Sequence, residues 1–145
     1  MRVRAYADGD WAEWLRMSVA LFPDYTAQDL ERGMREFRAR SDAEVFVVDR
    51  GDGSLGGFVE AGSRPYADGC ESSPVGYIEA WYVDQDLRLQ GYGRALLAAA
   101  EAWARARGYT EIASDALLDN EASHAAHRAS GYEEVERHIV FRKAI

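Results

Sequence analysis

Hydrophobic and charged residues alternate at the start of the chain, and large apolar residues then recur at helical spacing. Val3 and Ala5 alternate with arginines, which predicts a short strand. The large apolar side chains between Trp11 and Phe22 recur every three or four residues, so they lie on one face of a helix. Pro23 ends this helix because proline cannot continue it.

A second helix and two strands follow. Thr26, with Asp29 three residues later, resembles a capping box, and this helix closes at Arg40. The apolar runs at 44–49 and 55–61 are typical of strands, and the turn residues between them include two glycines. We expect these two strands to pair as a hairpin.

The middle of the chain combines an irregular segment with the strongest strand pattern. Residues 62–74 contain proline, glycine and serine without periodicity, which predicts a surface loop. Residues 75–83 are mostly apolar or aromatic, which is typical of a central strand. A helix is expected over 94–107, with Gly108 at its left-handed end, followed by a strand over 110–115.

The last part of the sequence predicts a helix and a closing hairpin. Asp119 or Asn120 caps a helix that runs to Ala129 and stops before Gly131. Residues 132–142 contain two stretches of strand composition that predict a hairpin. The order of strands and helices, without an internal repeat or linker, indicates one mixed α/β domain.

Composition limits the classes of protein to which the chain can belong. The 145 residues are 48% hydrophobic and 29% charged, unlike disordered or collagen-like chains. The formal net charge of −8 argues against nucleic acid as a partner and favours cationic ligands. No stretch approaches the roughly 20 apolar residues that cross a bilayer, so no membrane partner is expected.

Cysteine and histidine contents bear on location and metal binding. Cys70 is the only cysteine, so no internal disulfide can form, and a reducing, cytoplasmic location fits best. One cysteine and three histidines fall short of a structural zinc pattern, so no metal is expected. The N-terminal residues lack the apolar run of a secretory signal peptide.

The most informative segment for chemistry precedes the helix at 94–107. Gly91 and Gly93 allow the backbone to approach a diphosphate, whose charge the amides and dipole of the helix start attract. Arg88 and Arg94 could add side-chain contacts. The glycine spacing differs from the dinucleotide-binding pattern, and the ATP-binding lysine motif is absent. A tight helix entry that binds no ligand is the alternative interpretation.

Two motifs carry a resemblance to a known family. The sequence Arg88-x-x-Gly91-x-Gly93, directly after a strand, resembles the coenzyme A pyrophosphate motif of the Gcn5-related N-acetyltransferases. The later signature is Asn120 at a helix start, an alanine-rich helix, and Gly131 followed by tyrosine where the family commonly has phenylalanine. The order of elements matches this family over essentially the whole chain.

This resemblance implies one domain over residues 1–145. In that fold, helices flank a mixed, mostly antiparallel sheet that splays between its fourth and fifth strands. The resemblance also implies acetyl-CoA as cosubstrate. The backbone amides of residues 89–94 would then bind its pyrophosphate, and the backbone of residues 81–83 would bind the pantetheine arm and the thioester carbonyl. The implied cofactor-binding residues are Trp81, Tyr82, Val83, Arg88, Leu89, Gln90, Gly91, Tyr92, Gly93, Arg94 and Asn120.

Further local features are similar to the aminoglycoside 6′-N-acetyltransferases of the chromosomally encoded enterobacterial and Acinetobacter type. They are Tyr66-x-x-Gly69-Cys70-x-Ser72-Ser73-Pro74-Val75, Glu79, Ala113-Ser114-Asp115 and Glu134-x-Glu136-Arg137. This resemblance implies direct transfer of the acetyl group to the 6′-amine of an aminoglycoside in a ternary complex, and hence antibiotic resistance. It also implies a homodimer, for which the C-terminal strands are available.

The same resemblance implies which residues line the aminoglycoside site: Tyr66, Glu79, Asp115 and Glu136. Phe22 stands where this subfamily usually has a tryptophan before the proline, so its contact with the sugar can differ. Three carboxylates at neighbouring strand ends would concentrate a substrate that carries several ammonium groups.

Direct attack on a thioester needs a neutral amine, so a carboxylate must accept a proton directly or through a water molecule. Glu79 and Asp115 are the two candidates. We favour Glu79 as the base and Asp115 as the group that orients the amine, although the sequence does not separate these roles. His127 lies where many members of the superfamily place a tyrosine that protonates the departing thiolate, and an ordinary structural histidine is the alternative.

Two other functions are compatible with these residues. The acceptor could be a polyamine, an amino sugar or a protein amine, because the acidic cleft serves any small polycation. The domain could instead bind acetyl-CoA as a sensor without catalysis, although the presence of Glu79 and Asp115 argues against this. A covalent acetyl-cysteine step is not expected, because acidic neighbours raise the pKa of the Cys70 thiol.

Overall fold

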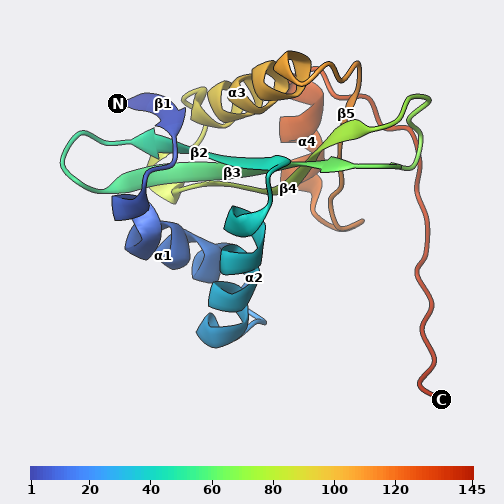
Figure 1. Cartoon of the computed structure of the whole chain (residues 1–145), viewed down its shortest axis with the longest axis horizontal. Coiled ribbons are helices and arrows are strands. Elements are labelled where there is room, and N and C mark those ends of the chain that lie inside the picture. Colours follow the sequence, from blue (N-terminus) through green and yellow to red (C-terminus); the bar gives the residue numbers. More distant parts are fainter.

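A five-stranded sheet forms the centre of the computed structural model, which describes all residues from 1 to 145 (Figure 1). The strands lie side by side in chain order. Each consecutive pair from the first strand to the fourth is antiparallel, and the fifth strand is parallel to the fourth. They are β1 (Arg2–Ala5), β2 (Ala43–Asp49), β3 (Leu55–Arg64), β4 (Val75–Val83) and β5 (Ile112–Ser114). The mixed, mostly antiparallel sheet expected from the sequence is confirmed.

Helices cover both faces of this sheet. α1 and α2 lie on one face and α3 on the other, with α4 close to β5 (Figure 1). Short 3-10 turns, η1 and η2, come before α1 and α3. The bounds are η1 (Asp8–Asp10), α1 (Trp11–Leu21), α2 (Ala27–Ala39), η2 (Gln85–Leu87), α3 (Tyr92–Ala106) and α4 (Glu121–Ala129).

Each face of the sheet has its own apolar core, because side chains alternate between the two faces along a strand. Trp14 of α1 and Phe58 of β3 are completely buried in the core beneath α1 and α2. On the other face, Leu96 and Leu97 of α3 belong to a buried cluster with Val59 of β3. The apolar stripes predicted from helical spacing are therefore the buried faces of these helices.

Side-chain caps explain why two helices begin where the sequence predicted. The Thr26 hydroxyl oxygen accepts a hydrogen bond from the Asp29 amide at 3.1 Å. The Asn120 carboxamide oxygen accepts one from the Ser123 amide at 3.1 Å. Such caps satisfy amides that have no partner within the helix. By contrast, α3 begins at Tyr92, two residues earlier than predicted.

Two strand boundaries differ from the prediction. β3 continues to Arg64, three residues into the predicted loop, because its last residues pair with the start of β4. β5 spans only Ile112–Ser114 rather than 110–115, because β4 provides a partner over three residues. The lengths of these strands depend on pairing with a neighbouring strand, and this pairing cannot be predicted from local composition.

The predicted closing hairpin at 132–142 is wrong for a single chain. No backbone hydrogen bond involves residues 133–145, here called the C-terminal tail, and this segment runs away from the domain (Figure 1). Its apolar side chains Val135, Ile139, Val140 and Phe141 are 59–88% exposed. An isolated two-stranded hairpin is marginal in water without an apolar surface to pack against, which explains its absence.

The sheet splays open between β4 and β5, as the family resemblance implied. β5 pairs with β4 only through Gly76–Ile78. Residues 79–83 of β4 therefore have no strand beside them on this edge. Their outward backbone groups have no strand partner, and the Val83 carbonyl oxygen accepts a hydrogen bond from Arg88 Nε instead.

A β-bulge lies at the same level of the sheet. Glu60 of β3 is opposite Ala80, whereas the next residue, Ala61, is opposite Ile78. Glu79 is therefore an extra residue without a partner in β3. Such a bulge generally bends the strand and changes the direction of a side chain, and this one lies where the splay begins.

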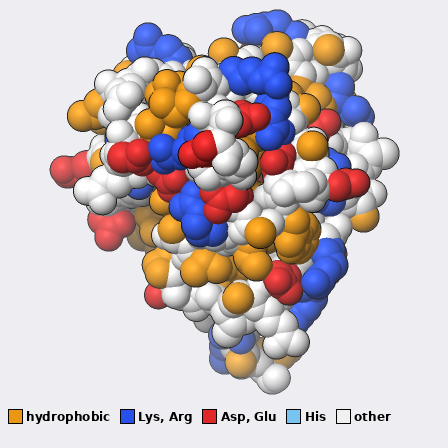
Figure 2. Space-filling view, turned by 90° about the vertical axis from the view of Figure 1, so that its left-hand side faces the viewer, with side chains coloured by type: hydrophobic (Ala, Val, Ile, Leu, Met, Phe, Trp, Pro, Cys, Tyr) orange, Lys and Arg blue, Asp and Glu red, His pale blue; other side chains and the backbone are white.

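Charged side chains of both signs gather at the centre of the face shown in Figure 2. This is the end of the molecule where the β2–β3 hairpin turns (Figure 1). Hydrophobic side chains are grouped below them in the same view. No helix in the structure is both long and apolar enough to pass through a bilayer.

Candidate active site

A groove opens where β4 and β5 separate, and twelve of its twenty lining residues are hydrophobic. Residues 78–83 of β4 line one side, and the end of β5 and residues of α4 line the other. The end of α1 and the loop before α3 also contribute. The predicted site residues in this lining are Phe22, Glu79, Trp81, Tyr82, Val83, Arg88, Leu89, Gly93, Asp115, Asn120 and His127. One groove thus joins predicted acceptor residues to predicted cofactor residues.

Glu79 is held by an arginine that the sequence did not single out. The Arg64 Nε and Nη2 atoms donate to the two Glu79 carboxylate oxygens at 2.8 and 2.7 Å. The same guanidinium lies over the Tyr77 ring, 3.5 Å from its centre, which is a cation–π contact. Arg64 therefore fixes the Glu79 carboxylate and compensates its charge.

Asp115 lies at the end of β5 and has a different partner. It accepts a hydrogen bond from the Tyr77 hydroxyl at 2.5 Å and forms no ion pair. Burial of the Tyr77 ring, followed by its hydrogen bond to Asp115, raises the pKa of the Tyr77 hydroxyl. Tyr77 consequently keeps its proton at neutral pH and acts as a donor. Of the two predicted acceptor-side carboxylates in the groove, Asp115 is therefore the one that forms no ion pair.

His127 of α4 joins both sides of the splay. Its Nδ1 lies 2.7 Å from the Ser123 backbone carbonyl oxygen, and its Nε2 lies 2.8 Å from the Ser114 hydroxyl of β5. A carbonyl oxygen only accepts hydrogen bonds, so we assign the proton of the neutral ring to Nδ1. The ring also packs edge-on against Trp81, with 5.0 Å between ring centres. His127 thus has structural partners and also lines the groove.

The backbone before α3 has an unusual shape. Leu89 and Gly91 both lie in the left-handed region, with φ of +62° and +90°. Nothing lies within 4 Å of where a Gly91 side chain would project, so conformation rather than space requires glycine there. At Gly93, a β-carbon would lie 3.1 Å from the Trp81 ring, so glycine permits α3 to approach β4.

Backbone donors in this region fit the diphosphate and pantetheine of a coenzyme A molecule. No side chain caps the start of α3, so its first amides lack partners. Arg88 uses only Nε, which donates to the Val83 carbonyl oxygen at 2.9 Å, and its terminal nitrogens make no hydrogen bond. Arg94 differs, because it donates to the Ala129 carbonyl oxygen and so ties α3 to α4. Four predicted cofactor residues of this segment do not line the groove: Gln90, Gly91, Tyr92 and Arg94.

Two predicted substrate residues lie outside the groove of a single chain. Tyr66 is 68% exposed, and its hydroxyl donates to Asp68 at 2.8 Å. Glu136 lies on the C-terminal tail, where its carboxylate clusters with Asp68 and His138 within 4.8 Å. The predicted cleft of three carboxylates is therefore incomplete in one chain, since only Glu79 and Asp115 reach the groove.

Sequence reasoning missed Arg64, Tyr77 and Ser114 as partners of the predicted residues. Arg64 falls in the segment predicted as a loop, and no local pattern signals its contact with Glu79. For Cys70 the expected direction holds, because its thiol pKa is raised. The causes are burial and then Glu111, rather than the acidic residues adjacent in sequence.

The fold and the groove define a coenzyme A-dependent acetyltransferase. A family model described as "Acetyltransferase (GNAT) family" matches residues 11–132, and the chain therefore belongs to the GNAT family.

Relatives of known sequence and structure agree over nearly the full length. The chain is 44% identical to the aminoglycoside N(6′)-acetyltransferase type 1 of Klebsiella aerogenes, over 99% of this chain and 96% of that protein. The protein of the same description from Stenotrophomonas maltophilia is 42% identical, over 97% of this chain and 91% of that protein. The crystal structure of AAC(6′)-IG from Acinetobacter haemolyticus has a TM-score of 0.92 at 33% identity and covers 100% of this chain and 99% of its own. AAC(6′)-Iy in complex with the bisubstrate analogue CoA-S-monomethyl-acetylneamine has a TM-score of 0.91 at 30% identity, covering 99% of this chain and 98% of its own.

Proposed function

We propose that this chain transfers the acetyl group of acetyl-CoA to the 6′-amine of aminoglycosides in a ternary complex, and thereby confers resistance to these antibiotics. The observation that carries this proposal is one groove that joins the glycine-rich loop to Asp115 and to the Glu79–Arg64 pair. The relatives described as aminoglycoside N(6′)-acetyltransferases support the choice of acceptor.

Acetyl-CoA supplies the thioester, and the part of this chain is to bind and orient it. The amides at the start of α3 receive the pyrophosphate, because uncapped helix amides attract negative charge. Residues 81–83 offer backbone groups on the open edge of β4 to the pantetheine arm. Asn120 offers its amide nitrogen, since its carboxamide oxygen already caps α4. Arg88 has terminal nitrogens available for a phosphate oxygen.

The acceptor binds at the other end of the groove through its ammonium groups. Asp115 receives one of them because no arginine or lysine forms an ion pair with it, whereas Glu79 is paired with Arg64. Phe22, half-buried at the end of α1, packs against the sugar ring through its apolar face. The Glu79–Arg64 pair faces the same region, and an ammonium can share Glu79 with Arg64 through the remaining lone pairs of the carboxylate.

The Arg64 ion pair changes how we divide the catalytic roles. The sequence favoured Glu79 as the base, but both Glu79 oxygens accept hydrogen bonds from Arg64. We therefore infer that Asp115 accepts the proton of the reacting amine, directly or through a water molecule, and that Glu79 orients the amine. His127 remains the proposed proton donor to the departing thiolate. For that step it must carry a proton on Nε2, which faces Ser114.

Release of free thiol from acetyl-CoA tests the reaction and the acceptor together. Neomycin and paromomycin form a matched pair, because they differ in carrying an amine or a hydroxyl at the 6′ carbon. We expect rapid turnover with neomycin and little with paromomycin, spermidine or a lysine peptide. Mass spectrometry of the product should place one acetyl group on the 6′ nitrogen.

The other outcomes each identify a different function. Equal turnover of neomycin and paromomycin would overturn the 6′ position while keeping the antibiotic as acceptor. Turnover with spermidine or the peptide alone would keep the acetyltransferase and overturn the substrate. Acetyl-CoA binding without turnover of any amine would favour a sensor.

The chain is proposed to act as a homodimer in which the C-terminal tail crosses to a second copy. The outer edge of β5 has no strand beside it, because β5 pairs only with β4. A second groove lies along this edge and is lined by residues 109–114, together with parts of α3 and residues 130–133. The tail has the composition of a strand and carries the exposed side chains Ile139 and Phe141. Pairing with the open edge of β5 in a second copy would give the tail a strand partner and bury these side chains.

Light scattering after size exclusion tests this dimer. We expect twice the chain mass for the full protein and a monomer when the chain ends at Tyr132. Because Glu136 lies on the tail, the shortened chain should also lose affinity for neomycin more than for acetyl-CoA. A fully active monomer would overturn the dimer and leave the acetyl transfer intact.

A cytoplasmic location is proposed on two grounds. Acetyl-CoA is a cosubstrate of the cell interior, and Cys70 is a free thiol without a partner cysteine. Residues 1–145 are proposed to act as one catalytic domain, since the sheet, both cores and the groove draw on elements from β1 to α4.

A further inference from the structure

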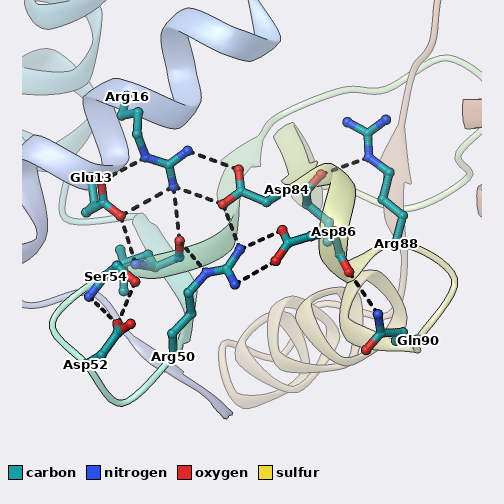
Figure 3. Close-up of polar contacts among 11 residues, drawn as sticks. Glu13, Arg16, Arg50, Asp52, Ser54, Asp84, Asp86, Arg88 and Gln90 are labelled. Atoms are coloured by element: carbon teal, nitrogen blue, oxygen red, sulfur yellow. Dashed lines mark hydrogen bonds and ion pairs between the residues drawn. The ribbon is translucent and has the colours of Figure 1, made fainter.

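Two arginines and three carboxylates form a connected network beside the start of the cofactor loop (Figure 3). Its members are Glu13, Arg16, Arg50, Asp84 and Asp86, and we call it the arginine–carboxylate network. They come from α1, from the turn between β2 and β3, and from the segment that leaves β4. None of them lines the groove, so their contacts serve another purpose.

Asp84, the first residue after β4, is the centre of the network. Arg16 donates to its two oxygens at 3.1 and 3.0 Å, and Arg50 donates to one of them at 3.1 Å. The Asp84 side chain is only 13% exposed. Burial opposes its ionisation, but the hydrogen bonds from Arg16 and Arg50 outweigh burial and lower the Asp84 pKa. Asp84 is therefore a charged anchor with two cationic partners.

Arg50 also holds the next turn of the chain. Its Nη1 and Nη2 atoms donate to the two oxygens of Asp86 at 2.9 and 2.8 Å. Its Nε donates to the Leu55 carbonyl oxygen at 3.2 Å. One planar guanidinium thus joins the start of β3 to two acidic residues around η2, which a lysine cannot do with a single ammonium group.

The first residues of β3 contact both the arginine–carboxylate network and the η2 turn. Arg16 donates to the Leu55 carbonyl oxygen at 3.0 Å, and Glu13 accepts from the Leu55 amide at 3.0 Å. The Asp84 amide donates to the Gly56 carbonyl oxygen at 2.8 Å. A β-carbon at Gly56 would lie 2.2 Å from a methyl carbon of Leu87, so Leu87 packs directly on this glycine.

Beyond Leu87, side-chain hydrogen bonds of the loop are to neighbouring residues only. Arg88 bonds to the Val83 carbonyl oxygen, and Gln90 bonds to the Asp86 carbonyl oxygen at 2.9 Å (Figure 3). Leu89 is fully exposed. Residues 88–91 therefore depend for their position on the segments at their two ends, which are residues 84–87 and the start of α3, where the Gly93 carbonyl oxygen accepts a hydrogen bond from Trp81 Nε1 at 3.1 Å.

We propose that Arg50 and Arg16 are positioning residues for the pyrophosphate loop, acting through Asp84 and Asp86. This inference rests on the proposed acetyl-CoA site. Without the network, the η2 turn can shift. The amide N–H groups of the loop and of the first turn of α3 then no longer all point at the diphosphate, and the affinity for acetyl-CoA falls. The acceptor end of the groove contacts neither arginine and keeps its geometry.

Steady-state kinetics of Arg50→Met tests this role. We expect the KM for acetyl-CoA to rise about tenfold, which corresponds to about 1.4 kcal/mol. The kcat and the KM for neomycin should stay within about twofold of the unchanged protein. Arg50→Lys should give an intermediate KM for acetyl-CoA, because it keeps the charge without the two-point contact.

A donor without the diphosphate separates positioning from general loss of structure. The kcat/KM for S-acetylpantetheine should be the same in Arg50→Met and in the unchanged protein, because this acetyl donor has no pyrophosphate for the loop to bind. Equal losses with both donors would overturn the proposal, and so would an unchanged KM for acetyl-CoA. Arg35→Met, which removes an exposed arginine of α2, is the matched control and should change neither value.

Asp86→Asn keeps the proposal testable if Arg50→Met does not fold. Asp86 is 62% exposed, so its substitution disturbs little packing, and it should still raise the KM for acetyl-CoA. Gly91→Val, within the loop itself, separates this inference from the site on which it rests. If Gly91→Val raises the KM and the Arg50 and Asp86 variants do not, the network has no positioning role; if Gly91→Val has no effect, the cofactor site itself is misplaced.

Discussion

Arg64 and Glu79 lie on adjacent strands, and their side chains meet in a two-point ion pair with N–O distances of 2.7 and 2.8 Å. The pair depends on the extension of β3 to Arg64 and on the bulge that frees Glu79 from pairing. It leaves Asp115 as the acid of the groove that forms no ion pair. This relationship makes the roles of the two acids experimentally separable.

Asp115→Asn is expected to lower the kcat for neomycin by about a hundredfold or more, because general base catalysis contributes roughly 10²–10⁴-fold. The KM for acetyl-CoA should stay within about twofold, because Asp115 serves the acceptor side. Tyr77→Phe keeps the carboxylate but removes its hydrogen bond, so we expect a loss of only about three- to tenfold. Steady-state kinetics with each substrate varied in turn measures both. Equal loss of acetyl-CoA binding in Asp115→Asn would contradict the assignment.

Glu79→Gln provides the comparison that decides which acid is the base. If Asp115 takes the proton, the Glu79 variant keeps the acidic limb of the pH–rate profile and mainly raises the KM for neomycin. The Asp115 variant should lose that limb. The reverse pattern would restore Glu79 as the base, as the sequence favoured.

Arg64→Met should lower the KM for neomycin several-fold, because Arg64 no longer competes with the substrate ammonium groups for Glu79. Arg64 is 41% exposed, so the effect on stability should stay below about 1 kcal/mol. Combining this change with Glu79→Gln should abolish the gain. A higher KM in the single variant would instead show that Arg64 is needed to hold Glu79 in place.

Gly91→Val should raise the KM for acetyl-CoA by about tenfold or more, because a β-branched side chain is strained at a φ of +90° and the loop must change shape. The KM for neomycin should not change. Gly9→Ala is the control, because Gly9 has open space around it and no positive φ. Isothermal titration with coenzyme A provides an independent measure of the same loss.

Glu60→Gln should change how stability depends on pH. Burial is the main cause that raises the pKa of Glu60 to about 7; the Trp14 hydrogen bond opposes this shift and Glu79 adds to it. The unfolded chain loses this proton near pH 4.3, so between about pH 4.3 and 7 the folded state holds a proton that the unfolded state lacks. Stability therefore falls as pH rises through this window and is level above it.

The glutamine variant removes that slope. It should be more stable than the unchanged protein by on the order of 3 to 4 kcal/mol at pH 8 and similar to it near pH 4. Urea unfolding at several pH values measures the difference. Glu36→Gln on the exposed side of α2 is the control. Parallel pH profiles for the Glu60 variant and the unchanged protein would contradict the prediction.

Local patterns were enough to place most elements and the ends of the groove. Helical spacing from Trp11 onwards, the Thr26 and Asn120 caps and the two glycines before α3 act through neighbours in sequence. Their consequences appear in the structure nearly where they were predicted. The splay was implied by resemblance and not by periodicity, because no local pattern reports how far two strands stay paired.

The sequence by itself determined the order of helices and strands up to α4 and the glycine-rich turn before α3, because caps, periodicity and glycine conformation are short-range properties. Only the tertiary structure decided the partners of those residues. Glu79 meets Arg64 across 15 positions, Asp115 meets Tyr77 across 38, and Asp84 meets Arg16 across 68. Strand register, a bulge and the packing of α1 on the sheet create these contacts. The tail shows the same limit: its composition suits a strand, but a strand forms only by pairing with another strand, and residues 133–145 make no backbone hydrogen bond within this chain.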